Sequence, residues 1–70
     1  MAKVLFYRVD KDNSIRIDRS ESIEGVTILE VLNSNSASGT DSIVFLNNKK
    51  TEDFTNTLKK GDLLFVFTKD

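Results

Sequence analysis

Two segments at opposite ends of this 70-residue chain are apolar on both of the faces that a β-strand presents. They are residues 3–9 (KVLFYRV) and residues 62–68 (DLLFVFT). Successive side chains of a strand point to opposite sides, and a strand with one face in water alternates between apolar and polar residues. Neither segment shows that alternation, so both faces of each strand need cover. The apolar side chains that we assign to one of the two sides are Val4, Phe6, Leu64 and Val66.

One short helix covers only part of one face, so something else must cover the other. Three kinds of cover remain open: closure of the sheet into a filled barrel, a second copy of the chain, or a groove for a foreign ligand. We expect self-association through the side that carries Val4, Phe6, Leu64 and Val66, because large exposed apolar patches mark association sites.

Five strands and one helix are predicted from side-chain pattern and turn residues. A polar turn at residues 10–13 (DKDN) joins the first strand to an alternating second one, and residues 33–41 (NSNSASGTD) are predicted to form a loop. The predicted strands are residues 3–9, 14–18, 26–32, 42–47 and 62–68.

The helix is predicted at residues 51–60 (TEDFTNTLKK). Thr51 is suited to cap its first turn, Phe54 and Leu58 fall on one face, and Gly61 is placed to end it. Residues 26–32 (VTILEVL) are ambiguous, since their apolar spacing also suits a helix. Their β-branched side chains favour a strand, and we predict a strand there.

Composition excludes several chemistries. The chain has no cysteine and no histidine, which removes disulfides, thiolate ligands, the commonest metal ligand and the usual general base. We therefore expect no metal, no cofactor and no enzymatic activity. Ten basic and eleven acidic residues give a net charge of −1, without the basic excess of a typical nucleic-acid-binding domain.

Size and codon bias give further expectations. Folding of so short a chain buries apolar surface worth on the order of 105 kcal/mol, and ordering the chain costs about the same, so close packing or oligomerisation is needed. No apolar run is long enough to cross a membrane and no signal sequence is visible, so we expect a cytoplasmic protein. The residues with AT-rich codons (Phe, Tyr, Met, Ile, Asn and Lys) number 25, whereas Gly, Ala, Arg and Pro together number 8. This imbalance suggests an AT-rich genome, which bacteriophages and streamlined bacteria often have. We expect a phage gene, whose product would act in the virion or in the infected host cytoplasm.

The sequence thus predicts a mainly β (α+β) domain over residues 1–70, an antiparallel sheet or partly open barrel in the order β-β-β-β-α-β. The predicted function is a non-catalytic structural or protein-interaction module that self-associates. The alternative is a small OB- or SH3-like barrel that binds single-stranded nucleic acid through aromatic and basic residues. The residues that suggest this alternative are Lys49, Lys50, Lys59, Lys60 and Lys69, with Phe65 and Phe67.

Overall fold

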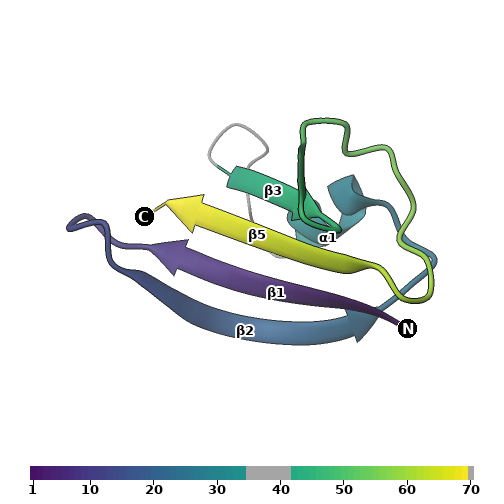
Figure 1. Ribbon diagram of the computed structural model, residues 1–70, viewed down its shortest axis with the longest axis horizontal. Helices are drawn as coiled ribbons and strands as arrows, with labels where there is room; N and C mark the ends of the chain where they lie inside the picture. Colours follow the sequence, from purple (N-terminus) through teal and green to yellow (C-terminus); the bar gives the residue numbers. More distant parts are fainter. Residues whose placement is uncertain (35–41, 70) are drawn as a thin grey trace.

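The computed structural model describes residues 1–34 and 42–69. It contains a mixed five-stranded β-sheet with one short helix on one of its faces (Figure 1). The predicted mainly β class is confirmed, and the sheet is open rather than closed into a barrel. The elements are β1 (Ala2–Val9), β2 (Ile15–Ile23), α1 (Ile28–Ser34), β3 (Ser42–Leu46), β4 (Lys49–Thr51) and β5 (Leu63–Lys69).

The strands lie in the order β2-β1-β5-β3-β4. β1 pairs antiparallel with β2 and parallel with β5, whereas β3 pairs antiparallel with both β5 and β4. The two segments that are apolar on both sides, β1 and β5, are therefore neighbours in the interior of the sheet and not at an edge.

Two tight turns connect the hairpins, and asparagine provides the backbone geometry in each. Between β1 and β2, Asn13 has φ of 67°, and its N–H donates to the Asp10 carbonyl over 2.9 Å. Between β3 and β4, Asn47 and Asn48 both have positive φ, of 52° and 69°. Two consecutive residues with positive φ are typical of the type I′ turn, whose twist matches that of a hairpin.

The helix lies at Ile28–Ser34, so the prediction of a strand over residues 26–32 is wrong and the true element order is β-β-α-β-β-β. A capping box starts this helix: Thr27 Oγ1 accepts from the Glu30 N–H over 3.2 Å, and the Glu30 carboxylate accepts from the Thr27 N–H over 3.4 Å. The next two free N–H groups, of Ile28 and Leu29, donate to the carbonyls of Asn56 and Phe54. These local and tertiary hydrogen bonds outweigh the weak helix propensity of the β-branched residues.

Residues 51–60 form no helix, which corrects the second assignment. Thr51 Oγ1 accepts from the Asp53 N–H over 3.2 Å, and Asp53 Oδ1 accepts from the Thr55 N–H over 3.1 Å. Such local side-chain bonds hold the backbone in turns and compete with helix formation. Further on, Leu58 exchanges backbone hydrogen bonds with Val26 and Gly25, so the segment runs beside the start of α1.

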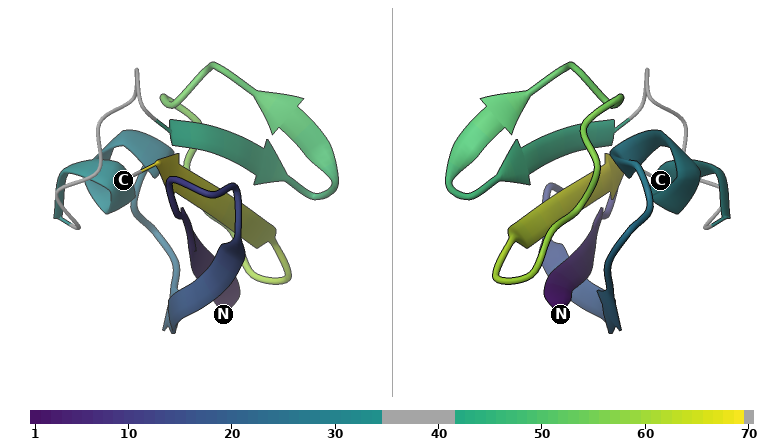
Figure 2. Two further views of the ribbon diagram at one scale, coloured as in Figure 1. Left: turned by 90° about the vertical axis from the view of Figure 1, so that its left-hand side faces the viewer. Right: turned by 90° about the vertical axis from the view of Figure 1, so that its right-hand side faces the viewer.

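The hydrophobic core lies between the sheet and α1, on one side only (Figure 2). Leu58 is buried there and Phe54 packs against it, so these two residues cover the core as predicted although they are not on a helix. The predicted loop at residues 33–41 falls mostly outside the described residues, and only its start, at the end of α1, is seen. The buried core residues are Ala2, Val4, Phe6, Ile28, Val31, Leu32, Val44, Leu58, Leu64 and Val66.

Candidate functional site

The side of the sheet opposite α1 is apolar and is covered by no described element (Figures 1 and 2). We call it the open face. Strand registers place one row of four apolar side chains straight across it, in which Ile17, Tyr7, Phe67 and Ile43 are successive partners from β2 to β3. The apolar side chains of the open face are Leu5, Tyr7, Val9, Ile15, Ile17, Ile43, Phe45, Leu63, Phe65 and Phe67.

Aromatic rings occupy the centre of the open face. Tyr7 stacks on Phe67 with ring centroids 5.0 Å apart and planes at 16°, and Phe45 meets Phe67 edge-on at 5.9 Å. These rings, with Phe65 and the turn residue Asn48, line a shallow hollow of about 520 Å³. We call it the aromatic hollow. Offset and edge-to-face contacts are the favoured geometries of aromatic pairs, so they hold the hollow's walls in place.

The isoleucines of the open face project beyond these rings. Ile15 and Ile17, both on β2, are 59% and 56% exposed, and Ile43 on β3 is 43% exposed. A sheet that meets water on one side normally carries polar residues there. Contiguous apolar side chains in their place are typical of an interaction surface.

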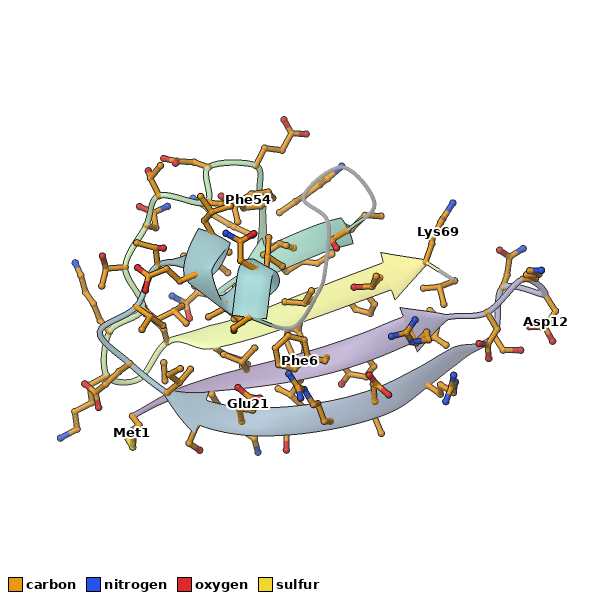
Figure 3. All side chains as sticks on the ribbon, turned by 180° about the vertical axis from the view of Figure 1, so that it is seen from behind. Met1, Phe6, Asp12, Glu21, Phe54 and Lys69 are labelled. Carbon is orange, nitrogen blue, oxygen red and sulfur yellow. The ribbon has the colours of Figure 1, made fainter. Side chains whose placement is uncertain are left out.

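The four residues that we expected on an association face lie elsewhere. Val4, Leu64 and Val66 are fully buried under α1, and Phe6 is 6% exposed. Seen from the helix side, Phe6 points into the space between the sheet and the helix (Figure 3). The structure brings the four together in the interior of the molecule and not on a surface. The surface left without cover belongs to the residues that alternate with them in β1 and β5.

The charged residues that the registers place on the open face are all lysines. Lys3 stands opposite Leu63, Lys69 stands opposite Val9, and Lys50 on the outer strand β4 stands opposite Phe45. Each is exposed, so the lysines lie at three sides of the face and surround its apolar centre. Lys50 and Lys69 belong to the basic group predicted from sequence. Lys59 lies instead on the segment between β4 and β5, where its N–H donates to Asp62 over 2.8 Å.

Neither outer strand offers a regular edge for pairing with another chain. β4 has only three residues, two of them lysines. β2 is longer, but its register against β1 shifts between Phe6 and Tyr7, and it is exposed and rich in charge. Bulges and charged side chains are the common means by which sheet edges avoid pairing. The ion pairs of β2, such as Arg19–Glu21 at 3.2 Å, are exposed and therefore contribute little stability.

The carboxylates whose pKa is lowered accept hydrogen bonds in the turns and loops between the strands. Hydrogen bonds from the side chain and N–H of Ser14 lower the pKa of Asp12, and those from Thr55 lower that of Asp53. The pKa of Asp62 is lowered first by the Asn47 side chain, which donates over 3.0 Å, and then by the Lys59 N–H. Asp12 and Asp53 are exposed and Asp62 is partly exposed, and all three accept hydrogen bonds from neighbouring backbone or side-chain groups. Over the described part of the chain, no three acidic residues gather where they could hold a metal ion.

Comparison with known proteins gives no match to any family model, any curated protein or any solved structure. None of the helical residues described here forms a segment long and apolar enough to pass through a bilayer. A topology alone does not define a function, so the function has to be argued from the open face.

Proposed function

We propose that this chain is a non-catalytic interaction module that self-associates, with a second copy of the chain as the occupant of the open face. The observation that carries the proposal is the uncovered apolar face, with aromatic rings at its centre and lysines around it. Interface cores are enriched in aromatic residues and depleted of charge, and lysine belongs at the rim.

The size of the face supports a second copy. Four strands about 4.8 Å apart and seven residues of about 3.3 Å each give a plan area of roughly 440 Å². Two such faces in contact remove on the order of 1,000 Å² from solvent, which is the lower limit of a specific interface. We therefore expect a dimer that forms in the micromolar range and dissociates on dilution.

Face-to-face stacking is the mode of association that the strands favour. Two twisted sheets pack well with their strands roughly aligned and their layers about 10 Å apart, as in a β-sandwich. Pairing through the sheet edges is disfavoured by the short β4 and by the irregular, charged β2. The open face is thus the surface on which a second copy gains the most apolar contact.

The test is the mass in solution as a function of concentration, by sedimentation equilibrium. Wild type should move from 7.9 kDa toward twice that mass between low micromolar and near-millimolar concentration. Ile17→Asp on the open face should remain monomeric without loss of fold, because this side chain is already exposed. The matched control is Leu29→Asp on α1, 46% exposed on the other side of the sheet, which should dimerise like wild type. A wild type that stays monomeric throughout, or an Ile17→Asp variant that dimerises normally, would refute the proposal.

Single-stranded nucleic acid is the second candidate occupant. Stacked aromatic rings on an open sheet face, with lysines beside them, are features of surfaces that stack bases and bind phosphates. The aliphatic Ile15, Ile17 and Ile43 around the rings favour protein instead, as does the net charge of −1. Fluorescence anisotropy with a labelled oligonucleotide separates the two. Binding that weakens with added salt and is lost in Lys50→Gln supports nucleic acid, and no binding at low salt removes it.

We also propose that the protein acts in the cytoplasm and is encoded by a phage. The absence of cysteine suits a reducing compartment, and the excess of residues with AT-rich codons suits a phage genome. A gene located among virion-assembly genes would support this origin, and a gene in a conserved bacterial operon would contradict it.

A further inference from the structure

The open face carries a projection and a hollow on opposite sides of its midline. The most exposed large hydrophobic side chains of the open face, Ile15 and Ile17, stand on β2, at one edge of the sheet. The aromatic hollow extends the other way, from Tyr7 on β1 across β5 to Phe45 and Asn48 at the far end of β3. A surface with both features fits a second copy only if the projection of each copy meets the hollow of the other.

A face-to-face dimer has its two-fold axis in the plane between the sheets, and the axis direction decides which residues meet. An axis parallel to the strands, over the boundary of β1 and β5, exchanges the two sides of the sheet. β2 of one copy then lies over β3 of the other, and Ile17 lies above Phe67 and Ile43, at the border of the aromatic hollow. The row Ile17, Tyr7, Phe67, Ile43 meets itself in reverse, so isoleucine faces isoleucine and ring faces ring.

An axis perpendicular to the strands places each strand over the same strand of the second copy, so that β2 faces β2. The hollow of one copy then faces the hollow of the other, which leaves a void between them. Ile17 and Ile15 lie over the β2 strand of the second copy, whose residues on this face include Ser20 and Ser22. Voids in an interface lose dispersion contacts, and close packing is the rule for stable interfaces.

On the basis of the self-association proposed above, we propose that the two-fold axis runs parallel to β1 and β5 and that Ile17 of each copy packs on Phe67 and Ile43 of the other, at the border of its aromatic hollow. This interface is isologous: position 17 contacts the region of position 43, and the reverse contact repeats it. The arrangement also places Lys50 of each copy outside the β2 edge of the other, so that the two Lys50 side chains are at opposite ends of the interface.

Cysteine cross-linking tests the arrangement, because the chain contains no cysteine of its own. Ile17→Cys and Ile43→Cys are prepared as separate proteins, one with an affinity tag so that mixed and like dimers differ in mass. Both side chains are exposed, so neither change should affect folding. A thiol-specific reagent that spans stacked sheets about 10 Å apart is then added at a concentration where wild type is dimeric. The matched control is Leu29→Cys, a similarly exposed aliphatic position on the helix side.

The expected result is a mixed 17–43 product in several-fold excess over 17–17 and 43–43 products, and no excess for Leu29→Cys mixed with either variant. A dominant 17–17 product would overturn the arrangement, since it places β2 over β2. Equal yields for all mixtures, including those with Leu29→Cys, would overturn it as well, because they indicate random collision. If wild type is monomeric, the proposed self-association fails. If wild type is a dimer with another cross-linking pattern, only the axis is refuted.

Discussion

Leu58→Ala tests whether the irregular segment between β4 and β5 holds the fold together. Leu58 is 1% exposed and belongs to the core, although no helix or strand positions it. Its backbone hydrogen bonds with Val26 and Gly25 do not involve the side chain, so the variant removes packing and leaves them intact. A buried Leu→Ala change costs about 2–5 kcal/mol, and we expect about 3 kcal/mol. At roughly 0.05–0.15 kcal/mol per residue, that is about 30% or more of the stability of a chain of this size.

Urea unfolding followed by far-UV circular dichroism measures this loss. With a slope of about 1 kcal/mol/M, the midpoint should fall by about 3 M urea. Protein concentration is kept low and equal for all variants, because the proposed self-association would add stability. Lys60→Ala, two residues along the chain and exposed, should change stability by less than about 0.5 kcal/mol. A loss below about 1 kcal/mol for Leu58→Ala would refute the packing of this segment on the core.

Three further changes test local features of the fold. Thr27→Ala removes the cap of α1 and should lower the free energy of unfolding, measured with urea, by about 1 kcal/mol. Glu30→Gln keeps the capping box and should lower it by less. Equal losses for the two variants would contradict the role of the cap. Gly61→Ala should lower the free energy of unfolding by about 1–2 kcal/mol and lower the melting temperature, because φ is +89° at this position. A Cβ would meet no other atom there, so the cost comes from the backbone alone. An unchanged melting temperature would contradict this prediction. The lowered pKa of Asp62 stabilises the fold above the ordinary carboxyl pKa, and this stability is lost as the pH falls through the lowered value. Asp62→Asn should therefore show a weaker loss of stability in acid than wild type, and an identical pH profile would refute the role of the Asn47 bond.

Local pattern predicts β1, β3, β5 and the turn before β2. The second strand, predicted at residues 14–18, runs on to Ile23, and the short β4 at Lys49–Thr51 is not predicted. A high density of apolar, β-branched and aromatic residues places β1, β3 and β5 within one or two residues of their true ends. The turn before β2 has the expected polar residues. Gly61 adopts positive φ in the turn before β5, but it ends no helix. These features depend on neighbouring residues in the chain, which is why a single sequence reveals them.

The helix was misplaced because its stability comes from distant residues. The pair Thr27 and Glu30 was a readable local signal, since a threonine followed three residues later by glutamate is a capping box. The seven-residue helix also depends on the carbonyls of Phe54 and Asn56, which accept its free N–H groups. Conversely, residues 51–60 have good helix-end signals, but their side chains bond locally in turns and their backbone pairs with residues 25–29.

The sequence by itself determined that two strands are apolar on both faces, so that both faces of these strands need cover. The sequence could not determine which face stays uncovered. Val4 and Phe6 on one face of the strand are about as apolar as Leu5 and Tyr7 on the other, so the side-chain pattern does not distinguish the two faces. Only the tertiary structure decides this. The path of the chain from β2 through α1 into β3 puts the helix on one side, and the opposite side, with Tyr7 and its neighbours, is left to water or to a second copy.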